Sequence, residues 1–206
     1  MELTDVCEVV ADTIEQATGA LLGADPAAAH RVLTAVTPAA RLVDWQEETI
    51  AVLVGRRRLN HRELREAIAA ARAVTELERM HDLARHIAKI VRMHGDEPVL
   101  PTPLRPRFAD MGEIARTMTL EAASVLYYGD KAYVETVAAA EREMDELHRS
   151  LFPVLTTLCR DRIDAGLVSQ FYEQYADHAV LLAGQFAATA ERSEEAAEVF
   201  GGRFFK

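Results

Sequence analysis

The chain contains two copies of one helical unit, and this repeat constrains its fold more than any other feature. A glutamate and an aspartate one helical turn apart, Glu78 and Asp82, return 95 residues later as Glu173 and Asp177. Upstream positions match at an offset of 105: Glu8 with Glu113, Ala17 with Ala122, Leu21 with Leu126, and Asp25 with Asp130. Two copies of this length predict two similar domains, because a solenoid needs more and shorter repeats.

Composition and periodicity predict that every element of these copies is a helix. Alanine, leucine, glutamate and arginine are abundant, aromatic residues make up 6% of the 206 residues, and β-branched runs bounded by glycine or proline are missing. Apolar residues recur at helical spacing in six segments, at about 3–22, 26–54, 60–93, 108–128, 131–160 and 164–193. We therefore predict an all-α fold of two tandem pseudo-repeated three-helix bundles.

A proline-rich segment separates the two copies. Residues 94–107 carry a glycine and four prolines, which is typical of a linker. The predicted domains are a first bundle over 1–93, the linker over 94–107, and a second bundle with a short tail over 108–206.

Several function classes have no support in the sequence. No apolar segment approaches the roughly 18 residues that span a bilayer, and no signal-peptide core begins the chain, so we expect a cytoplasmic protein without direct membrane insertion. The net charge of −10 argues against general nucleic-acid binding. Phosphate-binding loops, nucleophile elbows and Cys-His patterns are absent, so we expect no enzymatic turnover.

Acidic residues at core-facing positions mark the candidate chemistry of the second copy. Glu141 and His148 occupy places in an apolar stripe, and Asp145 lies one turn from Glu141. If the last helix packs alongside, Glu173 and Asp177 add two carboxylates to a group that suits hard or borderline cations. Without metal, at least one of these carboxyl groups should have a raised pKa because the like charges repel. Two alternatives stay open: solvation at a helix edge, and pairing with nearby arginines.

The first copy offers less. The positions that match the acidic pair of helix 131–160 are Val36 and Ala40, so Glu78 and Asp82 have no evident partners. A basic cluster at Arg56, Arg57 and Arg58 is a candidate partner-binding tip for an acidic partner or anionic lipid headgroups, although a solvated loop is the commoner explanation of such a run.

These motifs resemble those of the PhoU proteins. Leu64-Arg65 followed by Leu77-Glu-Arg-Met-His-Asp82 is similar to the third-helix signature of that family, and the spacing from Asp130 through Val137 and Glu141 to Asp145 is similar to its second-helix pattern. The resemblance covers about 5–192. The chain departs from the signature at His81 and Ala176, where the family has glycine.

The resemblance implies a fold, a metal site and a function. The fold is two tandem three-helix bundles. The metal is iron or zinc, often in multinuclear centres, and its ligands would be Glu141, Asp145, Glu173, Asp177, Glu78 and Asp82, with His148 as a further candidate. The function is negative regulation of phosphate uptake and phosphate-starvation signalling, through contacts with the ATPase of a phosphate ABC transporter, a sensor histidine kinase, or both. Such partners would hold a cytoplasmic protein at the membrane periphery, and a homodimer stays open.

A di-metal carboxylate enzyme in a helical bundle is the alternative. Ferritin-like enzymes use Glu-x-x-His motifs on facing helices, and Asp145-x-x-His148 weakly resembles one. The regulator is favoured because the repeat is two-fold with helices in threes, and because the last helix has no second motif of this kind.

Overall fold

The computed structural model describes residues 3–35, 61–128, 131–157 and 162–200. Within these ranges the regular elements are all helical, which confirms the predicted fold class. The helices are α1 (Leu3–Gly23), α2 (Pro26–Thr34), α4 (His61–His94), the short 3-10 helix η1 (Thr102–Leu104), α5 (Arg105–Tyr128), α6 (Lys131–Thr157) and α7 (Arg162–Phe200). The basic tip at Arg56–Arg58 and the positions Val36 and Ala40 lie outside the described residues.

Local sequence signals explain where α1 ends and α2 begins. The α1 helix ends at Gly23, and Ala24 takes a left-handed conformation with φ of 48°. The Asp25 carboxylate then accepts hydrogen bonds from the backbone N–H groups of Ala27 and Ala28, both at 2.9 Å. Pro26 occupies the first turn, where its missing N–H costs nothing.

The predicted linker, residues 94–107, packs against the helices. Gly95 has φ of 62° directly after α4, a conformation that glycine adopts without steric cost. Val99, Leu100 and Leu104 are buried, so the connection is anchored in the core. The α5 helix starts at Arg105, slightly earlier than the predicted Phe108, because Pro106 fits the first turn of a helix.

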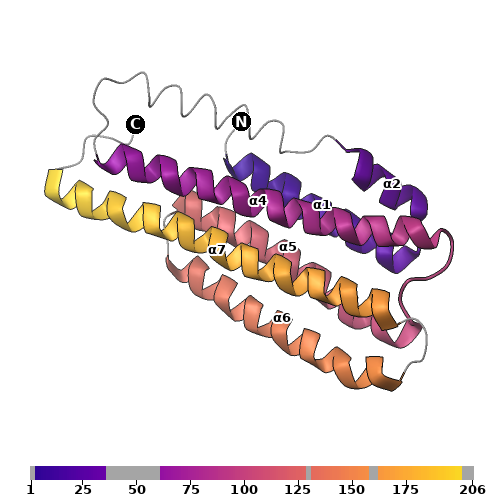
Figure 1. Ribbon diagram of the computed structural model, residues 1–206. Helices are drawn as coiled ribbons and strands as arrows, with labels where there is room; N and C mark the ends of the chain where they lie inside the picture. The colour runs from indigo at the N-terminus through magenta and orange to yellow at the C-terminus, as the bar shows by residue number, and fades with distance from the viewer. Residues whose placement is uncertain (1–2, 36–60, 129–130, 158–161, 201–206) are drawn as a thin grey trace.

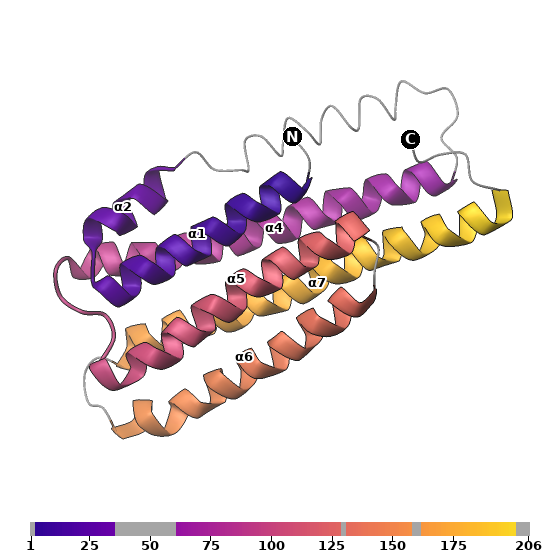
Figure 2. The same ribbon diagram turned by 180° about the vertical axis from the view of Figure 1, so that it is seen from behind.

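The helices form two bundles that share one core. In the first bundle α2 packs on α1 and α4, and in the second α6 packs on α5 and α7 (Figures 1 and 2). The inner helices α1, α4, α5 and α7 also pack on one another across the boundary between the copies. The buried side chains consequently form one continuous cluster that draws on both copies. None of the described helices is both long and apolar enough to cross a membrane.

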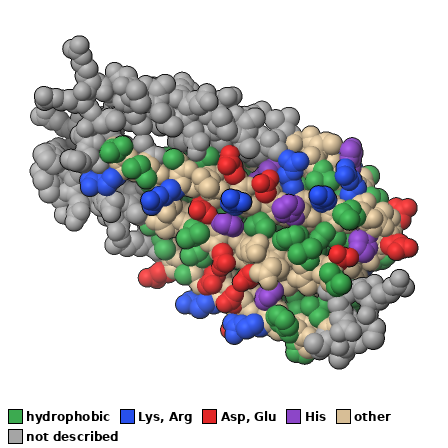
Figure 3. All heavy atoms as spheres, in the orientation of Figure 1, with side chains coloured by type: hydrophobic (Ala, Val, Ile, Leu, Met, Phe, Trp, Pro, Cys, Tyr) green, Lys and Arg blue, Asp and Glu red, His purple; other side chains and the backbone are tan. Residues whose placement is uncertain are grey.

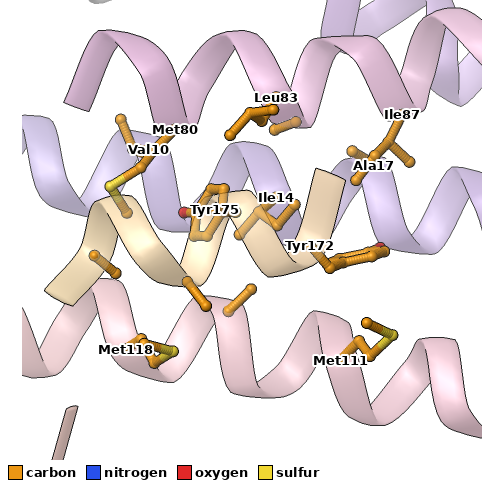
Figure 4. Packing of buried hydrophobic residues seen from close by; sticks show 14 of the residues in the cluster. Val10, Ile14, Ala17, Met80, Leu83, Ile87, Met111, Met118, Tyr172 and Tyr175 are labelled. Atoms are coloured by element: carbon orange, nitrogen blue, oxygen red, sulfur yellow. The ribbon is translucent and has the colours of Figure 1, made fainter. Parts of the chain in front are cut away.

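Two buried tyrosines of α7 bond to inner helices: Tyr172 to α1 of the first copy, and Tyr175 to α5 of its own copy. The hydroxyl of Tyr172 lies 2.6 Å from Oγ1 of Thr18 on α1, and the hydroxyl of Tyr175 lies 2.7 Å from Oγ1 of Thr119 on α5. Figure 4 shows both rings between the inner helices. All four groups are buried, so the partners satisfy hydroxyls that burial would otherwise penalise.

The α1 and α5 helices approach closely at Gly112. A Cβ atom on Gly112 would lie 2.4 Å from Cγ2 and 2.6 Å from Oγ1 of Thr18. The absence of a side chain therefore lets α5 come near the threonine that bonds Tyr172.

Candidate functional site

The predicted acidic residues of the second copy lie on facing sides of α6 and α7. Glu141, Asp145 and His148 follow one another at helical spacing on α6 and are all partly buried. On α7, Glu173 is partly buried and Asp177 is exposed one turn away. The two helices pack together, as the sequence analysis required.

Electrostatic coupling shows that these residues are near one another. The pKa of the Glu173 carboxyl is raised, first by burial and then by the negative charges of Asp177, Asp145 and Glu141, while His148 opposes the shift. The expectation of a raised carboxyl pKa in this group is thus met at Glu173. A site where like charges repel in this way is stabilised by a cation.

Two polar contacts orient Glu173 and His148. The Gln170 amide donates a hydrogen bond to the Glu173 carboxylate. His148 Nδ1 lies 2.7 Å from the hydroxyl of Ser169, which is buried on α7. Since Ser169 engages Nδ1, the second ring nitrogen of His148 stays available for another contact, the arrangement found in many metal-ligating histidines.

The carboxylate oxygens of this group are the kind of donor that a hard cation prefers, but in this structure they are not close enough together to coordinate one. Among the described residues, no three His, Cys, Asp or Glu side chains are grouped closely enough to hold a metal ion. Asp145 has a cationic neighbour instead, with its Oδ2 4.0 Å from Nη2 of Arg149. That pair is largely exposed, so solvent screens it and its contribution is small. Metal binding here requires side-chain rotation and stays a prediction.

The acidic pair of the first copy is separate from this group. On α4, Glu78 is partly buried and Asp82 is exposed. In both views α5 and α7 lie between α4 and α6 (Figures 1 and 2). The six predicted carboxylates therefore occupy two places, and the positions Val36 and Ala40 that match the α6 acids in sequence lie outside the described residues.

A buried histidine of the first copy escaped the sequence analysis. His81 is 4% exposed, and neither ring nitrogen has a hydrogen-bond partner. Its pKa is lowered, first by burial and then by the charge of Arg85, so the neutral imidazole is favoured. The equivalent position of the second copy holds the small Ala176, also buried. The departure from glycine in the motif was the available signal.

Histidine–carboxylate pairs join α4 to α7 and were also missed. His178 Nδ1 lies 2.6 Å from a carboxylate oxygen of Glu76, and His94 Nε2 lies 2.9 Å from one of Asp164. The two residues of each pair are 102 and 70 positions apart in the sequence, so no short-range spacing could indicate the contact. Both pairs are partly buried and join the first copy to the second.

Comparison of the sequence with known proteins identifies a family. The PhoU domain model matches residues 3–91 and 108–185, which are the two repeated units. The chain belongs to the PhoU family. It is 34% identical over 190 residues to "Phosphate-specific transport system accessory protein PhoU homolog 2" of Mycobacterium bovis, with 88% of this chain and 87% of that protein covered. It is 33% identical over 204 residues to the PhoU homolog 1 of Mycobacterium leprae, with 94% and 90% covered.

Solved PhoU structures share the fold. The crystal structure of PhoU from Pseudomonas aeruginosa matches with a TM-score of 0.80 at 20% identity, over 91% of this chain and 93% of that one. The phosphate transport system regulatory protein PhoU from Streptococcus pneumoniae matches with a TM-score of 0.64 at 18% identity, over 98% and 93%. These likenesses support the two-bundle architecture, while the family assignment rests on the domain model and the more similar relatives.

Proposed function

We propose that this PhoU-family protein is an accessory protein of phosphate transport that restrains phosphate uptake and phosphate-starvation signalling. The observation that carries the proposal is the match of the family model to both repeated units, together with relatives about one-third identical over nearly the whole chain. Those relatives are named as accessory proteins of a phosphate-specific transport system.

The protein acts by binding other proteins, without turnover of its own. The relatives are named for an accessory role and not for a reaction. The di-metal enzyme alternative is disfavoured by α7, where the third residue after Glu173 is Ala176 in place of a histidine ligand. The partners we propose are the ATPase of the phosphate ABC transporter, a sensor histidine kinase, or both. Binding to them would place a cytoplasmic protein at the membrane periphery, and self-association as a homodimer is compatible with this role.

We also propose that the α6–α7 acidic group binds a divalent cation such as iron or zinc. The support is the raised pKa of Glu173 in the field of three further carboxylates, and a histidine whose ring is fixed through Ser169. A cation bound by residues of both helices would stabilise their packing, because its binding energy adds to the stability of the folded state. The metal content of the purified protein tests this part separately from regulation.

Gene deletion tests the regulatory proposal. Phosphate uptake should rise at high external phosphate in the deletion strain and return to the parental rate when the gene is restored. A reporter of the phosphate-starvation response, measured at high and low phosphate in the same strains, should be derepressed only when phosphate is plentiful. Unchanged uptake and unchanged reporter output in both media would overturn the proposal.

A further inference from the structure

The solvent-facing side of α4 carries a row of cations, which we name the α4 basic ridge. Its members are Arg65, Arg72, Arg79, Lys89 and Arg92. All five side chains are exposed. The first three recur at every seventh residue, a spacing that keeps them on one side of the helix about 10 Å apart. Among the described α4 side chains, Asp82 is the exposed acid that accompanies them.

The charge of the ridge is positive, whereas the net charge of the whole chain is negative. The chain has 23 lysines and arginines against 33 acids, for a net charge of −10, yet the exposed side chains of one helix include five of these cations, and three of them share one side of it. The exposed charged residues of α1 are all acidic: Asp5, Glu8, Asp12 and Glu15. In Figure 3 the blue side chains follow the course of α4 as a row. The α1 helix lies toward the other side of the molecule, in front in Figure 2.

The ridge cations are not engaged within the described part of the molecule. None of the five takes part in an ion pair there, whereas Arg116 pairs with Glu15 at 3.0 Å. Solvated helix faces usually alternate charges at helical spacing, which gains a few tenths of a kcal/mol per pair. Glu76 and Asp82 lie at such spacing from Arg72 and Arg79, whereas Lys89 and Arg92 are like charges three residues apart and Arg85 lies four residues before Lys89. The arrangement at the C-terminal end of α4 opposes helix stability and leaves positive charge available to a partner.

Exposed apolar side chains accompany the cations. Ile68 is 45% exposed and Met93 is 75% exposed, and both fall on the same side of α4 as the ridge by helical spacing. A face of this kind offers positive charge for attraction and orientation, and apolar area that a partner would bury. We propose that the α4 basic ridge is the docking surface for an acidic, amphipathic segment of a partner protein, lying lengthwise along α4.

Two other occupants fit the molecule less well. A flat anionic membrane would also meet the Asp and Glu side chains that Figure 3 shows below the blue row, on the same side of the molecule as the ridge. A narrow protein segment along α4 avoids those acids and meets only the acids of α4 itself, of which Asp82 is exposed. A second copy of this chain could offer its acidic α1, but an α1-to-α4 contact is heterologous and would extend into a chain of subunits unless its rotation closed a ring.

This inference refines the partner contact of the proposed function but does not depend on which protein carries the acids. A photo-reactive amino acid at Thr75, which is exposed between Arg72 and Arg79, should cross-link the full-length protein in cells to an acidic segment of another protein. Mass spectrometry of the cross-linked peptide identifies that segment. Arg72→Glu with Arg79→Glu should lower the cross-link yield by about tenfold or more, because attraction becomes repulsion.

A matched variant controls for net charge. Arg31→Glu with Arg142→Glu changes exposed arginines of α2 and α6 by the same total charge and should leave the yield unchanged. Arg65→Glu with Lys89→Glu provides a second ridge variant, and equal urea midpoints for all variants show that each is folded. Replacing acids of the identified segment by lysine should restore cross-linking to the Arg72→Glu, Arg79→Glu protein.

Four results would overturn the inference: a cross-link that ridge reversal does not reduce, a cross-link to another copy of this chain, the absence of any protein cross-link at Thr75, or ridge-dependent flotation with phosphatidylglycerol vesicles but not phosphatidylcholine vesicles. The outcomes also separate this inference from the proposed function. An acidic partner outside phosphate transport would support the ridge and oppose the proposed partners. Capture of the transporter ATPase through a different surface would do the reverse.

Discussion

Replacing Gly112 by alanine should destabilise the protein, although alanine is the better helix former. The new methyl group would lie 2.4 Å from Cγ2 of Thr18, whereas carbon atoms pack at about 3.5–4.0 Å. Thr18 is poorly able to move. Its hydroxyl lies 2.7 Å from the carbonyl oxygen of Ile14 and 2.6 Å from the Tyr172 hydroxyl, and its β-branched side chain has few rotamers. The methyl group therefore overpacks the α1–α5 contact and also displaces Thr18 from its hydrogen bond with Tyr172.

The size of the effect follows from three contributions. Glycine to alanine inside a helix gains about 1 kcal/mol. Overpacking a core costs about 1–3 kcal/mol, and leaving a buried hydroxyl unpaired costs about 1–3 kcal/mol more. The free energy of unfolding should therefore fall by about 3 kcal/mol, which lowers the melting temperature of a chain of this length by roughly 6–12 °C.

Thermal and urea unfolding followed by circular dichroism measure this change. Gly19→Ala is the matched control, because Gly19 is a helical glycine of α1 with no atom within 4 Å of an added Cβ, and it should gain up to about 1 kcal/mol. Adding Thr18→Ala to Gly112→Ala removes the two nearest obstructing atoms, Cγ2 and Oγ1, and leaves Cβ at 2.9 Å, so the double variant should lose less than the sum of the single losses. If Gly112→Ala proved as stable as the wild type, the close α1–α5 approach would be wrong.

Two further predictions concern the α6–α7 acidic group. Since the pKa of Glu173 is raised in the folded protein, this carboxyl favours folding below its unfolded pKa and opposes it as pH rises through the folded pKa. Glu173→Gln should therefore unfold at a higher urea concentration than the metal-free wild type at pH 7, with the difference shrinking near pH 4, and a wild type at least as stable at pH 7 would contradict this. Protein purified without chelator should contain iron or zinc by elemental analysis, and the Asp145→Ala, Asp177→Ala double variant should contain less; equal contents would refute the metal site.

The helices were predictable because their signals are local. Asp25 with Pro26 marks a helix start within three residues, and Gly95 marks the end of α4 by a left-handed conformation that glycine tolerates. The repeat then assigned three predicted helices to each copy, which is the basis of the two-bundle prediction. The described α4, from His61 to His94, matches the predicted segment at about 60–93 within one residue at each end.

The candidate site was predictable only along each helix. The spacing of Glu141, Asp145 and His148 places them on one side of α6 whatever the tertiary structure. The contacts of His148 with Ser169 and of His178 with Glu76 depend on how α7 is rotated and shifted against its neighbours. That rotation is set by the whole core, including the close approach at Gly112, and leaves no signature at short spacing.

The α4 basic ridge was predictable in part: the spacing of its arginines, but not the side of the helix that faces solvent. Its seven-residue spacing is visible in the sequence, but the same arginines would be core-adjacent if α4 were rotated by half a turn. The packing of Leu77 and Met80 into the core fixes which side meets water.

The placement of Tyr172 and Tyr175 on one helix has a consequence for how the two copies can diverge. A change on the inner side of α7 has to suit α1 of the first copy and α5 of the second at once, because each tyrosine is bonded to a different copy. Within the described part of the molecule, α6 packs on α5 and α7 of its own copy. Mutational freedom is therefore least where the copies meet and greater on α6. A duplicated protein of this design can keep an acidic pair on α6 and lack the matching acids in the sequence of its first copy, while its shared core stays intact.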